Sequence, residues 1–191
     1  MKKGILILCI ACCYLAGFSQ EKGTFTDPRD GKVYKTVKIG SQWIMAENLA
    51  YKPSNGNYWA YNNQQSNVSK FGYLYDWETA KAVAPAGWHL PTITEWDTLY
   101  KYLGADTREV FNALLKGGNS GFNAQFGGLR RNDGVFFNKE KSTNYWSSTA
   151  QNDKEAWSLF LAAKTSIASN FAKTCFTDTD IGYSVRLFKD K

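Results

Sequence analysis

The chain has 191 residues, of which 43% are hydrophobic and 21% charged, and its formal net charge is +6. This length suits one compact domain, and the composition excludes a disordered or collagen-like chain. Lysine and arginine are scattered, and Arg130 with Arg131 forms the densest basic pair, which argues against a nucleic-acid partner.

The first residues are typical of a secretory signal peptide. Lys2 and Lys3 precede an apolar run over residues 5–16 that is too short to span a bilayer. We therefore predict a signal peptide over residues 1–19, followed by a single domain over residues 20–191 without a transmembrane segment. The expected location is the periplasm, the cell surface or the medium.

A lipid anchor is the alternative to a released protein. Cys12 could carry the lipid after cleavage inside the apolar run, although Cys9 stands where leucine would be expected. Cleavage after residue 19 removes three of the four cysteines and leaves 21 basic and 17 acidic residues, a net charge of +4. Cys175 then remains as a lone thiol, which can form neither an internal disulfide nor a dithiol pair.

The mature chain opens with a pattern of strands and turns. Residues 27–31 form a cluster typical of a turn, and Gly40 with Ser41 marks a second turn. Between these turns, Val33, Val37 and Ile39 lie on one side of an alternating run, so we predict β-strands before the first helix.

Residues 53–70 form a polar stretch that is predicted to be a long loop, and such loops are usually functional or mobile. Tyr58, Trp59, Tyr61 and Asn62 are the candidate ligand-binding residues, because aromatic faces and amides suit the recognition of sugars or proteins. Alternatively, the three aromatic side chains pack the loop onto its own domain.

Three helices are predicted in the middle of the chain. Asp76 is placed to cap the first, which stops near Pro85. Thr92 and Glu95 fit a capping box at the start of the second, so Glu95 has a structural assignment. The third is predicted over residues 106–115, with its apolar residues on one face.

The last third of the chain reads as short strands, rich in aromatic and β-branched residues and separated by Gly, Asn and Asp. Trp146 is predicted to lie in the core, because tryptophan is highly buried on average. Strands, then helices, then strands indicate an α+β fold with an antiparallel sheet. The strings that predict these strands are FNAQFGGLRR, GVFF, NYWSST, AWSLFLA and GYSVRLF.

No catalytic constellation is visible in the sequence. His89 is the single histidine and lies between Trp88 and Leu90, so we interpret it as a structural or hydrogen-bonded residue. Asp178 and Asp180 lack the ligand pattern of a calcium loop and are predicted to lie in a solvated turn. We predict no metal site and no cofactor.

Five strings in order resemble the Fibrobacter succinogenes major paralogous domain, a family found in secreted and surface proteins of Bacteroidetes-type bacteria. They are DGKVYKTVKIGSQWIMAENL, GYLYDWETAKAVAPAGWHLPTITEW, GGLRRNDGVFF, NYWSST and GYSVRLF. The resemblance implies a C-type lectin-like fold, distantly similar to the formylglycine-generating, sulfatase-modifying group. Residues 90–96 and 182–186 resemble the helix start and the closing strand of that group. The structural signature of this frame comprises Trp88, His89, Pro91, Thr92, Glu95, Trp96, Trp146 and Arg186.

The departures from these relatives bear on function. Formylglycine-generating enzymes use a pair of cysteines, whereas only Cys175 remains after signal cleavage. The Glu-Pro-Asn, Gln-Pro-Asp and Trp-Asn-Asp motifs of calcium-dependent lectins are absent. We therefore predict an exported, non-catalytic module that binds a carbohydrate or an envelope protein. The alternatives are a self-assembling structural component of the cell envelope and an enzyme that uses Cys175.

Overall fold

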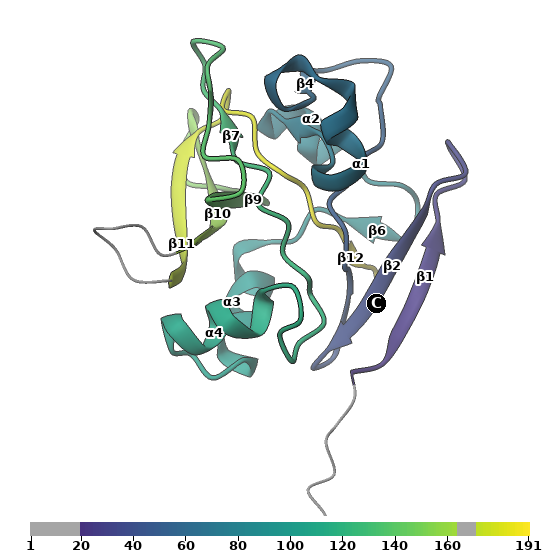
Figure 1. The fold of residues 1–191 in the computed structure, drawn as a ribbon, viewed down its shortest axis with the longest axis vertical. Helices are drawn as coiled ribbons and strands as arrows, with labels where there is room; N and C mark the ends of the chain where they lie inside the picture. Colours follow the sequence, from purple (N-terminus) through teal and green to yellow (C-terminus); the bar gives the residue numbers. More distant parts are fainter. Residues whose placement is uncertain (1–19, 164–170) are drawn as a thin grey trace, which may run out of the picture.

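The computed structural model describes residues 20–163 and 171–191, and the predicted signal peptide over residues 1–19 lies outside the described residues. Two antiparallel sheets stand on opposite sides of the molecule (Figure 1). The first has the strand order β1-β2-β3-β12-β6, so that β12, the last strand of the chain, lies between two earlier ones. Its strands are β1 (Lys22–Thr26), β2 (Val33–Ile39), β3 (Gln42–Met45), β6 (Trp88–His89) and β12 (Phe188–Lys189).

The second sheet has three strands in the order β11-β10-β9. They are β9 (Ser142–Ala150), β10 (Glu155–Ala162) and β11 (Phe171–Asp178). Two short pairs complete the β-structure: β4 (Tyr58–Trp59) with β5 (Leu74–Tyr75), and β7 (Leu129–Arg130) with β8 (Phe136–Phe137). The expected α+β class with antiparallel sheets is confirmed, whereas β11 is a strand that the sequence analysis missed.

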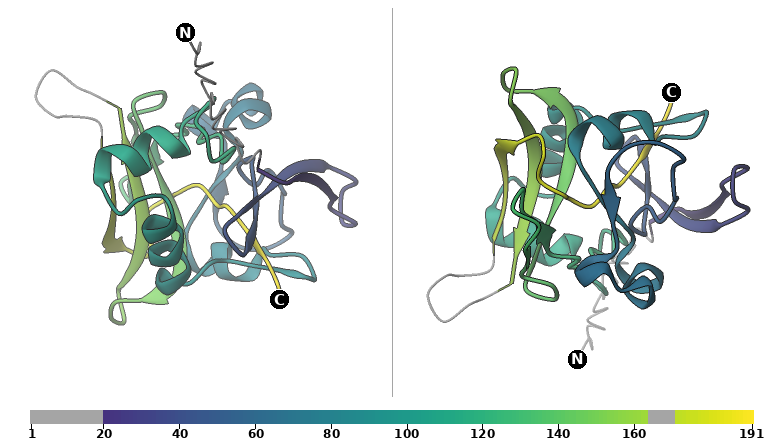
Figure 2. Two further views of the ribbon diagram at one scale, coloured as in Figure 1. Left: turned by 90° about the horizontal axis from the view of Figure 1, so that it is seen from below. Right: turned by 90° about the horizontal axis from the view of Figure 1, so that it is seen from above.

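All four described α-helices lie in the middle of the chain: α1 (Val68–Phe71), α2 (Trp77–Ala82), α3 (Ile93–Tyr102) and α4 (Thr107–Leu114). The expectation of two to three helices omitted the single turn α1. Side-chain caps start the other three, since Asp76 accepts from Thr79 N, Asp106 accepts from Arg108 N and Glu109 N, and Thr92 and Glu95 form the capping box. Helices α3 and α4 pack against the three-stranded sheet (Figure 2).

The predictions for residues 53–70 and for residues 122–128 need correction. Residues 53–70 are not one loop, because they contain β4, α1 and the two 3-10 turns η1 (Tyr61–Asn63) and η2 (Gln65–Asn67). Residues 122–128 are predicted as a strand but make only isolated bridges. Val33 is 55% exposed, although Val37 and Ile39 on the same side of β2 are buried.

Two clusters of buried apolar side chains make up the core, and β9 lies between them. Tyr145 belongs to the cluster beneath α3 and α4, whereas its neighbour Trp146 belongs to the cluster beneath α2. Successive residues of a strand point to opposite faces, and each face of β9 is covered by one of the two clusters. Both side chains are therefore fully buried. At this boundary the indole N–H of Trp96 donates to Trp146 O (3.3 Å), and the indole N–H of Trp146 donates to Tyr75 O (2.8 Å).

Residues 181–187 run between the two sheets and are buried throughout (Figure 2). Residues 182–188 were predicted as a regular strand, yet residues 182–184 make single bridges to Arg130, Tyr75 and Tyr145, and only Phe188 lies in a strand, β12. The segment therefore joins three elements instead of extending one sheet.

Arg186 lies in this segment, and its guanidinium is fully buried. It donates to Asn48 Oδ1 (2.7 Å), to the carbonyls of Met45 and Phe122 (2.8 Å each), to Asn123 O (2.9 Å) and to Gln125 Oε1 (3.4 Å). Burial lowers the pKa of Arg186, but a guanidinium ordinarily titrates above about pH 12, so the group stays charged. One side chain thus ties β3, the 122–125 segment and the C-terminal segment together.

His89 closes the edge of the five-stranded sheet. Its Nδ1 lies 2.7 Å from Asp190 Oδ1 and its Nε2 lies 2.9 Å from Glu95 Oε1, while Glu95 Oε2 accepts from Thr92 N at 2.8 Å. Both ring nitrogens face carboxylates, which favours the doubly protonated imidazolium. Partial burial lowers the pKa of His89, but the bonds with Asp190 and Glu95 outweigh it, so the pKa is raised.

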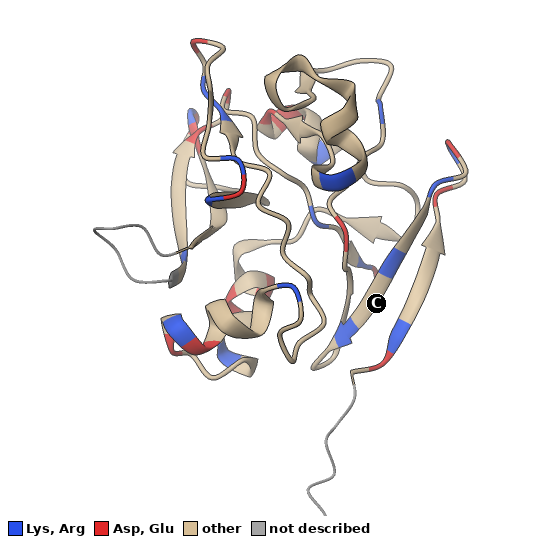
Figure 3. Cartoon of the chain, viewed as in Figure 1, with Lys and Arg blue, Asp and Glu red and all other residues tan. Residues whose placement is uncertain are grey.

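Lys and Arg lie interspersed with Asp and Glu along the described part of the chain (Figure 3). Among the described residues, no helix is both long and apolar enough to cross a bilayer.

The Arg186 network predicts a large loss of stability in Arg186→Met. The substitution leaves the carbonyls of Met45, Phe122 and Asn123 without their donor, and an unpaired buried acceptor costs roughly 1–3 kcal/mol. Urea unfolding followed by tryptophan fluorescence should therefore give a free energy of unfolding at least about 3 kcal/mol below that of the parent. Arg131→Met, at an exposed position, is the control and should shift it by less than about 0.5 kcal/mol. Overlaying curves for Arg186→Met and the parent would contradict the prediction.

The His89 contacts should contribute to the free energy of unfolding by an amount that decreases as pH rises. Because the pKa of His89 is higher in the folded than in the unfolded protein, this contribution is fully present below about pH 6.5 and is lost as pH rises through the folded pKa. Its size stays below about 1 kcal/mol, since the side chains are partly exposed. The parent should therefore lose stability relative to His89→Gln between about pH 6 and pH 9. Parallel stability profiles for the two proteins would count against this assignment.

Candidate functional site

The four residues predicted to bind ligand lie on β4 and η1. Tyr58 is half-buried and meets the Tyr73 ring edge-on, with centroids 5.2 Å apart. Tyr61 is buried, and its ring centroid lies 5.2 Å from that of Phe136. Asn62 is exposed and adopts a positive φ of 53°, a conformation that asparagine tolerates better than most residues.

The Trp59 ring packs against other residues of the same chain. The Arg130 guanidinium lies 4.1 Å from the ring centroid. Gly182 packs so closely that a Cβ on it would stand 3.0 Å from Trp59 Cε3. These contacts give Trp59 a packing role between β7 and the C-terminal segment, which matches the alternative of a loop anchored by its aromatic side chains. Ligand binding by the four residues stays a prediction.

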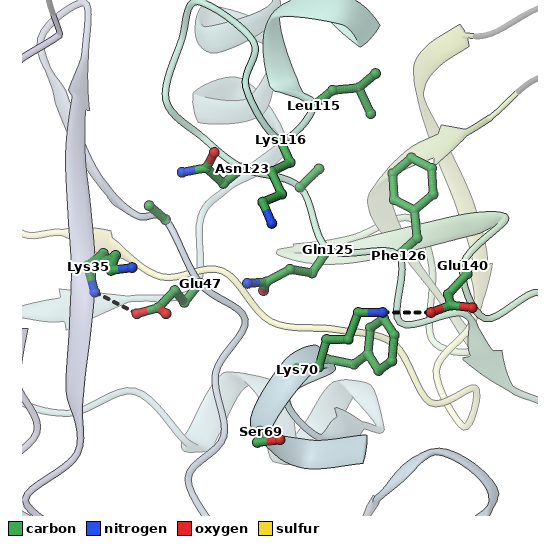
Figure 4. A pocket seen from close by; sticks show the side chains of 13 residues that line it. Lys35, Glu47, Ser69, Lys70, Leu115, Lys116, Asn123, Gln125, Phe126 and Glu140 are labelled. Atoms are coloured by element: carbon green, nitrogen blue, oxygen red, sulfur yellow. Dashed lines mark hydrogen bonds and ion pairs between the residues drawn. The ribbon is translucent and has the colours of Figure 1, made fainter. Parts of the chain in front are cut away.

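A pocket of about 630 Å³ lies beside this region, between the five-stranded sheet, α1 and the chain that follows α4 (Figure 4). Lys35 and Glu47 line it from the sheet, and Lys70 from α1. Gln125 and Lys116 line it from the segment after α4. A volume of this size falls within the range of about 300–1,000 Å³ that is usual for ligand sites.

Gln125 is the most firmly held polar group of the pocket. Its Oε1 accepts from Asn48 N (2.8 Å) and from Arg186 Nη2 (3.4 Å). Its backbone N–H donates to the Tyr145 hydroxyl (3.1 Å), and its carbonyl accepts from that hydroxyl (3.2 Å). Because both partners of Oε1 are donors, the amide orientation is determined, and Nε2 is left as a donor on the pocket side.

Asn48 holds the floor of the pocket beneath Gln125. Its Nδ2 donates to Phe71 O at 2.8 Å, and its Oδ1 accepts from Arg186 Nε at 2.7 Å. Gly72 fits closely against this residue, since a Cβ on it would stand 2.5 Å from Leu49 O. The floor therefore combines a rigid polar network with a close backbone approach.

Two phenyl rings give the pocket its apolar surface. Phe71 is 5% exposed, whereas Phe126 is only half-buried and packs near Phe111 with ring centroids 6.2 Å apart. Both residues line the pocket. The half-exposed Phe126 ring is the one that a bound molecule could cover.

The charges around the pocket are unevenly paired. Lys70 Nζ and Glu140 Oε1 form an exposed ion pair at 2.6 Å, and this contact lowers the pKa of Glu140. Glu47 turns toward β2, where its Oε2 accepts from Lys35 N at 2.8 Å (Figure 4). Within residues 20–163 and 171–191, neither the Lys35 nor the Lys116 ammonium pairs with a carboxylate.

Cys175 and His89 stand outside this pocket. Cys175 Sγ lies 3.4 Å from Ser158 Oγ and 3.8 Å from Asn144 Nδ2. Burial raises the pKa of the Cys175 thiol, and the Ser158 contact offsets this only in part. No group of three or more His, Cys, Asp or Glu residues suited to a metal ion occurs in the described part of the chain.

The structural signature residues belong to the frame, and one of them, Arg186, also holds Gln125 of the pocket. Trp88 is buried and its ring centroid lies 5.0 Å from that of Phe25, and Pro91 O accepts from Ser148 N at 2.8 Å. Trp96 is completely buried. The contacts of the other five signature residues are described above: Thr92, Glu95, His89, Trp146 and Arg186.

The residues that line the pocket were not predicted from the sequence. Gln125 and Phe126 lie in the string predicted as a strand, and Lys116 lies in the glycine-rich stop of α4. One feature of the sequence pointed to these residues. Polar Asn123 and Gln125 alternate with apolar neighbours, so the side chains of this segment that face away from the core are polar and either meet solvent or bind a partner.

The comparisons with known proteins bear on family alone. The Fibrobacter succinogenes major domain matches residues 37–189, which is most of the chain. No curated protein and no solved structure matches it. On this evidence, the chain belongs to the Fibrobacter succinogenes major domain family.

Proposed function

We propose that this protein is an exported, non-catalytic binding module that holds a carbohydrate in the pocket beside α1. The observation that carries the proposal is the juxtaposition of the oriented Gln125 amide donor and the half-exposed Phe126 ring in one pocket. A sugar can accept a hydrogen bond from Gln125 through a hydroxyl group and can pack its apolar ring face on Phe126. Pre-formed ligand sites usually combine a few polar groups with apolar surface in this way.

The non-catalytic part of the proposal rests on the environment of Cys175. A reactive cysteine needs a positive neighbour or a base that favours the thiolate. The two groups that contact Cys175, the Ser158 hydroxyl and the Asn144 amide, are neutral. The charge of Lys173 lowers the pKa of the thiol, but burial is the larger effect and keeps that pKa above its ordinary value. These surroundings suit an inert thiol better than a nucleophile.

The C-type lectin-like fold and the export of the protein are part of the same proposal. The family resemblance and the pairing of the last strand β12 with the early strand β3 support such a fold. The apolar run over residues 5–16 supports export to the periplasm, the cell surface or the medium, with a lipid on Cys12 as the alternative anchor.

Binding of residues 20–191 to a broad glycan array, with and without calcium, tests the proposal. Phe126→Leu should weaken binding of any captured glycan about tenfold, because a buried aromatic contact is worth roughly 1–2 kcal/mol. Asn62→Gly is the matched control: it removes the exposed amide of the predicted loop and tolerates the positive φ, so binding should persist.

Two outcomes would contradict the pocket assignment. Loss of binding in Asn62→Gly with retention in Phe126→Leu would move the site to the loop over residues 53–70. Capture of no glycan by the parent would remove the carbohydrate proposal. A mass in solution that then rises with concentration would favour the self-assembling envelope component instead.

Alkylation of Cys175 tests the non-catalytic assignment. We expect iodoacetamide to label the folded protein at least about tenfold more slowly than the urea-unfolded protein at the same pH, because the folded thiol is shielded and mainly protonated. Cys175→Ser, which has no other cysteine in residues 20–191, gives the background. Faster labelling in the folded state would indicate an activated thiol and would contradict the assignment.

A further inference from the structure

We infer that the pocket beside α1 selects an acidic saccharide, whose carboxylate or sulfate group is bound by Gln125 Nε2 and the Lys116 ammonium. This inference rests on the proposed function and adds the charge of the ligand to it. Three features of the described residues carry it: a buried cation without a charged hydrogen-bond partner, an amide that links this cation to the pocket, and unpaired lysines around the pocket.

The buried cation is Arg186. Its five hydrogen bonds all end on neutral oxygens, three from backbone carbonyls and two from the side chains of Asn48 and Gln125. Glu47 acts on it only through space, and that carboxylate is already bonded to Lys35 N. Because none of these hydrogen bonds ends on a carboxylate, the guanidinium leaves a positive potential around it, which favours an anion nearby.

Gln125 carries this potential to the pocket. Its Oε1 accepts from Arg186 Nη2, and a hydrogen bond from a charged donor polarises the amide toward a more positive Nε2–H. Asn48 N holds the same oxygen at 2.8 Å, so the amide has little freedom to reverse. The group that faces the pocket is thus a donor with no acceptor function, which suits an oxyanion.

The lysines around the pocket complete the anion site. Lys70 is neutralised by Glu140, and Glu47 turns away toward β2, so the two acids of the pocket are both engaged. In Figure 4 the Lys116 side chain extends into the pocket from the chain after α4. Lys35 is exposed on the opposite wall. A carboxylate bound between Gln125 and Lys116 would receive one oriented N–H donor and one mobile ammonium.

The test compares two probes with the same sugar skeleton, tri-galacturonic acid and its fully methyl-esterified form, which is neutral and carries a methyl group on each carboxyl. Titration calorimetry on residues 20–191 should give at least about tenfold tighter binding of the acid, equivalent to one charge-assisted hydrogen bond. The preference should shrink as salt is raised. A sulfated galactose trisaccharide forms a third arm, and it distinguishes a site for any oxyanion from one that requires a carboxylate.

Gln125→Glu is the decisive variant, because it is nearly isosteric. One carboxylate oxygen can still accept from Asn48 N and Arg186 Nη2, while the other replaces the pocket-facing donor with a negative acceptor. The variant should therefore unfold at an equal or higher urea concentration than the parent, since Arg186 gains a counter-ion, and yet lose its preference for the acid. Lys116→Gln, at an exposed position, should retain stability and weaken acid binding several-fold without affecting the neutral ester.

The outcomes separate this inference from the proposed function. Equal affinity of the parent for acid and ester would overturn the inference and leave a carbohydrate pocket standing. Unchanged acid preference in a folded Gln125→Glu protein would also overturn it. If neither galacturonate probe nor the sulfated one binds, the inference falls, and the glycan array decides the fate of the proposed function separately.

Discussion

The buried guanidinium of Arg186 is the contact on which the rest of the arrangement depends. Its bonds hold β3, Asn48 and residues 122–125 around the C-terminal segment, and its face lies over the Phe122 ring, with the charge 4.5 Å from the centroid. The carbonyls and the guanidinium depend on one another, because each buried carbonyl needs a donor and the buried cation needs several acceptors. Burying any one of these groups without its partners would cost free energy. The frame and the floor of the pocket are therefore one network.

This shared network explains why the pocket is pre-formed. Gln125 is oriented by the same bonds that satisfy Arg186, so the donor that faces the pocket needs no rearrangement to meet a ligand. The lysines of the rim, by contrast, are exposed and can adapt. A rigid floor with a mobile rim suits recognition of one chemical group on ligands that differ elsewhere.

The parts of the structure that depend on local signals were predictable from the sequence. The caps Asp76, Thr92 and Asp106 give α2, α3 and α4 their starts, because a cap acts within one helical turn. β4 and α1 were missed because β4 is a two-residue strand that exists only by pairing with β5, and α1 is a single turn of four residues. Gln125 has no distinctive neighbours in sequence, and its role appears only when Arg186 and Asn48 meet it.

The sequence separation of the Arg186 contacts has a consequence for how the chain folds. The partners of the guanidinium lie 61 to 141 residues before it. The Arg186 network therefore cannot close until almost all of the domain has been synthesised. Late closure of this kind is compatible with passage through a narrow channel as an extended chain, with folding completed on the far side.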